Sequence, residues 1–269
     1  MASAADSYVH GHHRSILRSY ALRTADNSAA YLLPDLRAGQ TLLDVGCGAG
    51  SILADLAAVV SPGLTVGVDT SAEALSHAVE LSADRGLDNV VCAVGDVGAL
   101  AFPDDSFDVV HAHQLLQHVK DPVAALREMR RVCRPGGVVA ARDADYAAMT
   151  WYPVEPALDD WLALYSAVAR AGGGEPDAGR RLLSWAQAAG FTDITSGAST
   201  WCYATAEARE LWSASWAERI VRSGIAKTAS AQGIAGQEEL ERISAGWLRW
   251  GRTPDGWFTI LHGEIRCRA

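Results

Sequence analysis

A glycine-rich turn near residue 45 is the feature of this sequence that most directly indicates chemistry. Residues 42–50 read Leu-Leu-Asp-Val-Gly-Cys-Gly-Ala-Gly, so a short apolar run leads into three glycines at alternate positions. Gly46 and Gly48 let the backbone approach a ligand where a Cβ would collide, and Gly50 allows close helix packing. The N-terminus of the following helix favours a carboxylate, and Asp44 offers a negative group to an ammonium. A ligand with an amine and a carboxylate beside a nucleoside matches this pairing.

Two further acidic residues also follow short apolar runs. Asp69 ends the run Val-Gly-Val-Asp, and Asp96 follows Gly95. In doubly wound nucleotide-binding folds, a carboxylate at the end of the second strand accepts hydrogen bonds from ribose hydroxyls. Asp96, followed by Val97, is placed to accept the exocyclic amine of adenine. The alternative for Asp96 is a turn-forming aspartate.

Candidate proton acceptors follow the fourth and fifth apolar runs. His113 is the first candidate, and His118 and Tyr146 come next, because a neutral imidazole can take a proton near pH 7. The alternative for His118 is a polar residue at a helix terminus. For His111 we favour a core imidazole with a hydrogen-bond partner.

The stretch Arg-Asp-Ala-Asp-Tyr at residues 142–146 admits two interpretations. Asp145 or Tyr146 contacts an acceptor, or Arg142 and Asp143 form a surface ion pair of little energetic consequence.

Metal binding and disulfide formation are not indicated. His10, His12 and His13 lie close together, but adjacent histidines near a terminus are more often solvated or part of a lid. We therefore predict metal-independent chemistry. The five cysteines are each at least forty positions from the next, with no Cys-x-x-Cys pair, which favours free thiols in a reducing cytosol.

The elements that position these residues alternate between strand and helix over residues 41–143, which is typical of a parallel sheet covered on both faces. The predicted strands are Thr41–Val45, Thr65–Asp69, Val90–Val94, Phe107–His111 and Val138–Arg142. Thr70 with Glu73 predicts a capping box, and Asp121 before Pro122 predicts another helix start. Residues 7–33 read as helical before Pro34.

Beyond residue 150 the composition changes, because all nine tryptophans lie between Trp151 and Trp257. Helices are expected at 158–170 and 179–189, strands at 194–203 and 257–266, and a mostly helical insertion at 205–250. Trp161, Trp185 and Trp247 fall at helical spacing and favour the core. The better candidates for an acceptor pocket are Trp151, Trp201 and Trp212.

Bulk properties limit the partners. The net charge of −9 and the absence of a long basic cluster argue against nucleic acid. No leader and no long apolar run are visible, so we expect a cytoplasmic protein without membrane insertion, either a monomer or a homodimer.

Together these pieces resemble the class I S-adenosylmethionine-dependent methyltransferases, in the ubiquinone/menaquinone-biosynthesis-like branch. The resemblance covers residues 41–142 and rests on LLDVGCGAG, VGVD, VGDV, FPDDSFDVVHAHQLLQHVKDP and EMRRVCRPGG, in that order. It implies an α/β fold with a doubly wound, seven-stranded, mostly parallel sheet whose last strand is antiparallel, plus a helical cap.

By matching positions, the resemblance also implies a site for S-adenosyl-L-methionine. Asp44, Gly46 and Gly48 would hold the methionine moiety and Asp69 the ribose, and Cys47 and Thr70 would also belong to the cofactor site. Asp96 and Val97 would hold the adenine, the turn 112–114 with His113 would lie under the sulfonium, and Tyr20 and Arg23 would cover the methionine end.

The expected function is methyl transfer to oxygen, nitrogen or carbon of a small, aromatic or natural-product-like acceptor. The expected parts are a helical lid at 1–40, a cofactor-binding unit at 41–204, a cap at 205–250 and a final strand at 251–269, with lid and cap closing over the acceptor. The alternatives are a nicotinamide or flavin oxidoreductase on the same fold, which would need a different glycine spacing, and a non-catalytic cofactor-binding regulatory module.

Overall fold

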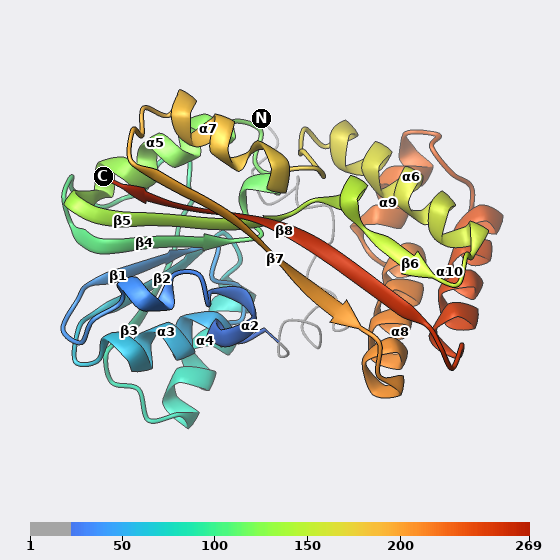
Figure 1. The fold of residues 1–269 in the computed structure, drawn as a ribbon, viewed down its shortest axis with the longest axis horizontal. Helices are drawn as coiled ribbons and strands as arrows, with labels where there is room; N and C mark the ends of the chain where they lie inside the picture. Colours follow the sequence, from blue (N-terminus) through green and yellow to red (C-terminus); the bar gives the residue numbers. More distant parts are fainter. Residues whose placement is uncertain (1–22) are drawn as a thin grey trace.

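One mixed sheet organises the molecule, and the computed structural model describes it within residues 23–269 (Figure 1). Its strands are β1 Leu42–Val45, β2 Thr65–Asp69, β3 Val90–Val94, β4 Phe107–His113, β5 Cys133–Ala144, β6 Thr150–Tyr152, β7 Ile194–Tyr203 and β8 Trp257–Arg268. The order is β3-β2-β1-β4-β5-β8-β6, and β7 pairs with β8. Strands β1 to β5 pair in parallel, whereas β8 runs antiparallel to β5, β6 and β7.

The predicted parallel core and antiparallel last strand are therefore confirmed. The structure adds β6, a three-residue strand that pairs with the start of β8 and is too short to show a periodic pattern. Strand β5 begins at Cys133, earlier than predicted, because Cys133 pairs with Phe107 of β4. The eight strands form a single sheet.

Helices cover both faces of the parallel part, as the apolar strands require. The bounds are α2 Ala25–Ser28, α3 Ser51–Val60, α4 Ala72–Asp84, α5 Pro122–Val132, α6 Pro156–Ala171, α7 Leu182–Ala188, α8 Ala206–Arg222, α9 Gly224–Ala231 and α10 Gln237–Gly251, with 3₁₀ turns η2 Leu33–Asp35, η3 Leu116–His118, η4 Tyr146–Ala148 and η5 Gly179–Arg181. In Figure 1, α5 and α7 lie above the sheet, and α2, α3 and α4 lie below it.

Two helix starts test the capping predictions. Asp121 Oδ1 accepts a hydrogen bond from the Ala124 amide at 2.8 Å, so the predicted start of α5 is confirmed. The predicted Thr70–Glu73 capping box is wrong. Helix α4 begins one residue later, and Ser71 Oγ accepts from the Ala74 amide at 3.2 Å. The Ser71 amide itself donates to Asp69, which fixes the register of the turn.

The prediction of one helix through residues 7–33 is wrong over most of its described part, because only Ala25–Ser28 is α-helical and Arg23 and Thr24 precede that helix. Helix α2 ends at Ser28, and turns lead into η2. Ala29, Leu32 and Leu36 are buried there against α3 and the lower sheet face, so tertiary packing outweighs helical propensity. Residues 1–22, and the expected lid within them, lie outside the described residues.

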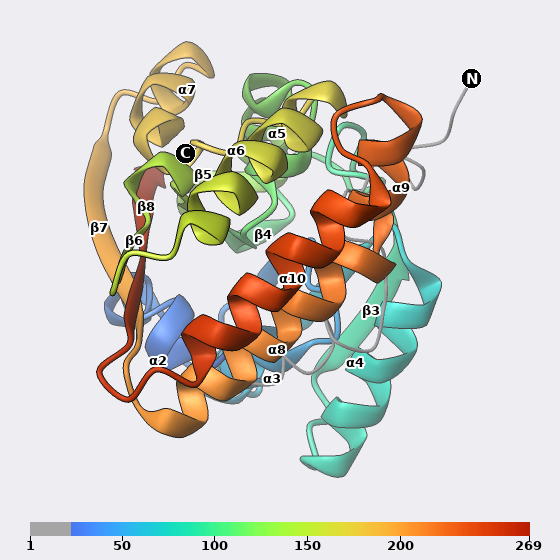
Figure 2. The same ribbon diagram turned by 90° about the vertical axis from the view of Figure 1, so that its right-hand side faces the viewer.

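A second layer, built from α6, α8, α9 and α10, lies beside the end of the sheet that contains β6 (Figure 2). Its core contains Trp161, Trp216, Trp247 and Trp250, each at most 1% exposed. Strands β7 and β8 run from the parallel sheet into this layer (Figure 1). Helix α6 packs against α10, so the apolar core of the layer extends beyond the expected cap at 205–250.

Candidate functional site

The glycine turn lies at the carboxyl edge of β1 and adopts backbone conformations that need glycine. Gly46, Gly48 and Gly50 have φ of +72°, +54° and +83°. A Cβ at Gly46 would lie 3.0 Å from Leu115 Cδ1, and one at Gly50 would lie 2.6 Å from Ala78 Cβ. Gly50 therefore allows close helix packing, as the sequence predicted, and Gly46 packs closely against Leu115.

Asp69 ends β2 beside that turn and holds its shape. Its Oδ2 accepts from the Gly48 amide and its Oδ1 from the Ser71 amide, both at 2.9 Å. The carboxylate is half-buried and each oxygen retains acceptor capacity. Asp69 thus lies where a group accepting ribose hydroxyls is expected.

Asp44 is 2% exposed and lies against a histidine. The Nδ1 atom of His111 is 2.7 Å from Asp44 Oδ1, because the two residues are paired across β1 and β4 and point to the same face. The interpretation of His111 as a core imidazole with a hydrogen-bond partner is confirmed.

The remaining predicted cofactor residues surround the turn. Burial raises the pKa of the Cys47 thiol well above its usual value, and Cys47 packs over Gly67. Thr70 is exposed. Asp96 is exposed and accepts from the Gly98 amide at 2.8 Å, so it does form a turn, while Val97 is buried in the core beside it. Tyr20 lies outside the described residues.

A buried ion pair crosses the sheet next to this edge, and it corrects one expectation. Arg142 and Asp143 do not form a surface pair, because both are 0% exposed and adjacent strand residues point to opposite faces. Arg142 Nε instead donates to Glu264 Oε1 at 3.2 Å and to Ser199 Oγ at 3.0 Å. Burial lowers the pKa of Arg142 to about 10, a value at which it remains charged at neutral pH.

Gln114, which sequence reasoning named only as part of a turn, joins β4 to three other elements. Its φ is +51°, and its amide donates to the Arg142 carbonyl at 2.7 Å. The side-chain Oε1 accepts from Arg23 Nη2 at 2.8 Å, and Nε2 lies 2.8 Å from His262 Nε2. Burial lowers the pKa of His262 well below 6.5, so its neutral ring accepts from the amide of Gln114.

His113 is 7% exposed, and its ring lies beside those of Trp201 and His262, with centroids 5.6 and 6.2 Å away. Neither ring nitrogen has a hydrogen-bond partner among the described residues. Burial, reinforced by Arg23 and Arg142, lowers its pKa well below 6.5. His113 is therefore neutral.

A small pocket lies beyond the ends of β4 and β5, between the sheet and α8, with a cavity volume of about 30 Å³. It is lined by residues from both halves of the chain: Arg23, Gln114, Gln117, His118, Ala144, Tyr146, Met149, Trp201, Trp212, Trp216, Arg219 and Ile260. His118 and Tyr146 of the three candidate proton acceptors line it, and His113 does not.

The pocket keeps His118 uncharged. Burial, with Arg23 nearby, lowers the pKa of His118 to about 4. Its Nε2 lies 3.0 Å from Gln117 Nε2, and Tyr146 stacks on Tyr165 at 4.1 Å between ring centroids.

The tryptophan predictions are confirmed only in part. Trp161 and Trp247 are buried in the core as predicted, and Trp185 is partly buried against the core. Trp201 and Trp212, which were predicted for an acceptor pocket, line this pocket. Trp151 is not in the pocket, because it stacks on Phe258 at 5.7 Å within the core of the helical layer. Trp216, which the sequence analysis did not single out, lines the pocket.

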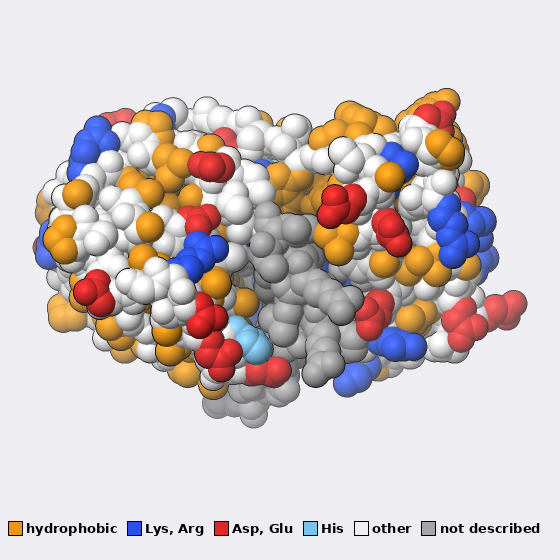
Figure 3. Space-filling model, turned by 90° about the horizontal axis from the view of Figure 1, so that it is seen from below, with side chains coloured by type: hydrophobic (Ala, Val, Ile, Leu, Met, Phe, Trp, Pro, Cys, Tyr) orange, Lys and Arg blue, Asp and Glu red, His pale blue; other side chains and the backbone are white. Residues whose placement is uncertain are grey.

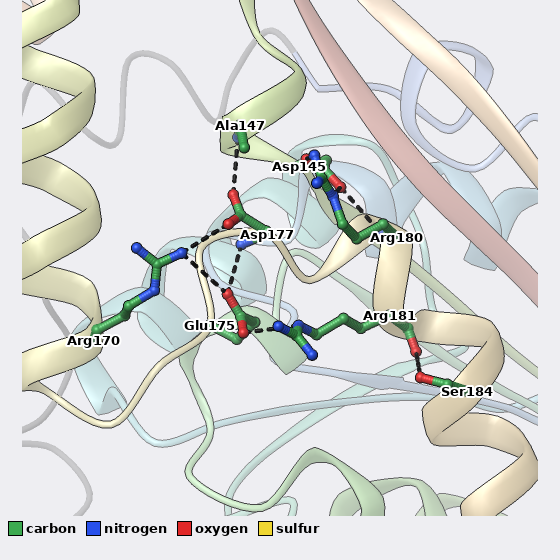
Figure 4. A network of polar contacts seen from close by, with 8 residues as sticks. All are labelled: Asp145, Ala147, Arg170, Glu175, Asp177, Arg180, Arg181 and Ser184. Carbon is green, nitrogen blue, oxygen red and sulfur yellow. Dashed lines mark hydrogen bonds and ion pairs between the residues drawn. The ribbon is translucent and has the colours of Figure 1, made fainter.

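Two aspartates near the pocket hold the surrounding structure. Asp145 does not contact the pocket; it is bound by Arg180 through two side-chain contacts of 2.7 and 2.6 Å, in the network of Figure 4. Asp143 Oδ1 accepts from the Gln117 amide at 3.1 Å and so anchors η3. Complete burial raises the pKa of Asp143 to about 7.

The described residues contain neither a metal-binding cluster nor a helix that could span a membrane. Within residues 23–269 no cluster of three or more His, Cys, Asp or Glu side chains could hold a metal ion. His10, His12 and His13 lie outside that range. No described helix is both long and apolar enough to span a membrane. All five cysteines are free thiols.

Comparison with known proteins identifies the family. A family model described as a methyltransferase domain matches residues 36–211. An uncharacterized methyltransferase of Schizosaccharomyces pombe is 34% identical over 267 residues, covering 96% of this chain and 95% of that protein. The ubiquinone/menaquinone biosynthesis C-methyltransferase of Bdellovibrio bacteriovorus is 40% identical over 103 residues, 38% of this chain and 43% of its own.

The solved structures agree on the fold. The YcgJ protein of Bacillus subtilis superposes with a TM-score of 0.58 at 20% identity, covering 89% of this chain and 97% of its own. These matches favour a transferase over the oxidoreductase and binding-module alternatives. The chain belongs to the methyltransferase-domain family and is an S-adenosylmethionine-dependent methyltransferase.

Proposed function

We propose that S-adenosylmethionine lies along the carboxyl edges of β1, β2 and β3. The glycine turn fits the group, because three glycines with positive φ place no side chain between the backbone and a ligand at the end of β1. Asp69 accepts the ribose hydroxyls, while Asp44, Gly46, Cys47 and Gly48 surround the methionine moiety.

The adenine lies by Asp96 and Val97, and Thr70 completes the cofactor site. The exposed carboxylate of Asp96 stands on a fixed turn, which suits an acceptor of the adenine amine. Arg23 bonds to Gln114 and therefore lies on the acceptor side of the cofactor.

The acceptor is a small molecule, of aromatic or natural-product type, bound in the pocket between η3 and α8. The observation that carries this proposal is the pocket's composition. Three tryptophans and a tyrosine offer flat apolar surface, and Gln114, Gln117 and His118 offer polar contacts at the end of β4. Such a mixture is typical of small-molecule sites.

The chain's own residues position the acceptor and exclude water. S-adenosylmethionine supplies an electrophilic methyl group, so the protein needs mainly to align and desolvate the nucleophile. His118 lines the pocket with a neutral ring whose Nε2 lies against the Gln117 side-chain amide, and it orients the hydroxyl or amine of the acceptor; its pKa of about 4 makes it a weak base. His113 is buried beside Trp201 and supports the pocket wall, and Tyr146 supplies a second polar contact.

A small acceptor, rather than nucleic acid, also suits the surface. In Figure 3, charges of both signs are scattered over both lobes of the described face. We propose a cytoplasmic enzyme, monomeric or homodimeric, that acts on oxygen, nitrogen or carbon.

A methyl-transfer screen tests the proposal. Purified protein is incubated with S-adenosylmethionine labelled in the methyl group and with panels of phenols, quinols and amines, and labelled product is measured. For an active phenol, His118→Gln and Tyr146→Phe should lower kcat, whereas His77→Gln, on the exposed face of α4, should not. Full kcat in both pocket variants would place the acceptor elsewhere.

A further inference from the structure

Strand β7 forms one edge of the sheet, and Figure 2 shows it along the left-hand margin of the molecule. Within the described residues it pairs with β8 alone, antiparallel from Ile194 to Tyr203. The Arg268 amide donates to the Asp193 carbonyl at 3.0 Å, which fixes the phase of the ladder. Because hydrogen-bonded pairs alternate along an antiparallel ladder, every second residue of β7 turns its amide and carbonyl away from β8. These outward residues are Ile194, Ser196, Ala198, Thr200 and Cys202.

This edge lacks the features that usually prevent a strand edge from pairing. Protected edges are short, or contain Pro, a bulge or charged side chains. Strand β7 has ten residues, none of them Pro, Asp, Glu, Lys or Arg, and its register with β8 is unbroken. In the described part of the chain, no backbone group bonds to the outward amides and carbonyls. The opposite edge strand, β3, has only five residues. Strand β7 is therefore the edge that can accept a further strand.

The outward residues of β7 complement a second copy of themselves. When two identical strands pair antiparallel, a two-fold axis passes through the centre of the pairing. With Ala198 on this axis, Ile194 faces the partner's Cys202. In the same register, Ser196 faces the partner's Thr200. Every outward amide and carbonyl of both copies is then paired, and no like charges meet near the axis, because the strand contains no charged residue.

We propose that two copies of this chain associate along β7, antiparallel about Ala198, so that one sheet continues through a homodimer. On the inner face of the sheet, Trp201 lies opposite the partner's Thr195. The Trp201 indole already donates to the Asn27 carbonyl at 2.7 Å, so its position is fixed before the partner binds. This association depends neither on the acceptor nor on methyl transfer.

Sedimentation equilibrium measures the association. At micromolar concentration the native chain should have twice its mass of 28.5 kDa. Ala198→Lys should raise the dissociation constant about tenfold or more, because two like charges would meet on the axis. Ala198→Thr, which adds no charge and keeps the outward amide, should remain a dimer. Val154→Lys adds the same charge at a side chain that is 80% exposed outside β7, and it should remain a dimer as well.

A disulfide tests the register. In a Cys202→Ser background, Ala198→Cys should form an interchain disulfide on mild oxidation. The Cα atoms of a facing hydrogen-bonded pair are about 5.5 Å apart, which a disulfide can span. Thr200→Cys is also exposed, but it lies four positions from its own copy along the paired strands, about 14 Å, and should not cross-link.

Four results overturn the inference. They are a native chain that is monomeric at micromolar concentration, a dimer that Ala198→Lys leaves intact, a dimer that Val154→Lys dissociates, and a Thr200→Cys variant that cross-links as readily as Ala198→Cys. Circular dichroism checks that each variant is folded. If Ala198→Lys does not fold, the comparison of the two cysteine variants decides, because neither of them places a charge on the strand.

Discussion

The buried carboxyl group of Asp143 predicts a measurable dependence of stability on pH. Burial raises its pKa from 3.8 to about 7, so between these values the folded state keeps a proton that the unfolded state releases. The stability that this group contributes is therefore largest at low pH and is lost as the pH rises through about 7. Asp143→Asn cannot ionise, yet its amide oxygen can still accept from Gln117.

The expected magnitude follows from linkage. With a folded-state pKa of about 7, the native carboxyl loses about 2 kcal/mol of stability between roughly pH 5.5 and pH 8.5. The free energy of unfolding of Asp143→Asn, minus that of the native protein, should therefore increase by about 2 kcal/mol over this interval. Taking the difference cancels the histidines, which titrate equally in both proteins.

Urea unfolding followed by circular dichroism at the two pH values measures this difference. Asp88→Asn removes one exposed negative charge and serves as the control. A difference for Asp143→Asn that stays constant with pH to within about 0.5 kcal/mol, or that falls, would refute the reasoning.

Four other changes have defined outcomes. Asp69→Ala should weaken S-adenosylhomocysteine binding about ten- to a hundredfold, measured by calorimetry, because charge-assisted hydrogen bonds are lost. Glu73→Ala, at an exposed position of α4, should leave this affinity unchanged. Below about pH 6.5, acidification should lower the free energy of unfolding, because His113, His118 and His262 are held neutral in the folded state but take up protons when unfolded. In a His118→Asn variant, the free energy of unfolding measured in urea should fall less steeply with decreasing pH. Arg142→Met should lower the free energy of unfolding, measured by urea unfolding, by about 3–5 kcal/mol, because Glu264 is left buried without its cation. Adding Glu264→Gln should recover part of this loss. Gly50→Ala should cost roughly 1–3 kcal/mol and lower the Tm, because the new Cβ would meet Ala78 at 2.6 Å.

The parallel half of the fold could be predicted because its signals are local. Each strand from β1 to β4 is a short apolar run, and the candidate functional residues lie within it or directly after it. Asp44 is followed by the glycine turn, and Asp69 ends β2. Strand β6 escaped prediction because three residues form a strand only through pairing with β8.

The pocket could not be assembled from the sequence, because its walls are distant in the chain. Arg23, Gln114 and Ile260 meet only once β8 has returned beside β5. The Arg142–Glu264 pair joins residues 122 positions apart, so nothing local to Arg142 indicated that it was buried. Arg219 did carry a signal, since it continues a tryptophan stripe on α8 at helical spacing.

Gln114 shows how the two halves of the site depend on each other. Its left-handed backbone, uncommon for a residue with a side chain, persists because its amide bonds to β5 and its side chain is held by Arg23 and His262. That conformation turns the chain from β4, beside the glycine turn, into η3, which presents His118 to the pocket. The end of β4, beside the glycine turn, and the pocket wall at η3 are therefore consecutive parts of one chain segment. A change at Arg23 or His262 that releases Gln114 would alter the distance between the two substrates, and since alignment dominates methyl transfer, activity would fall before folding does.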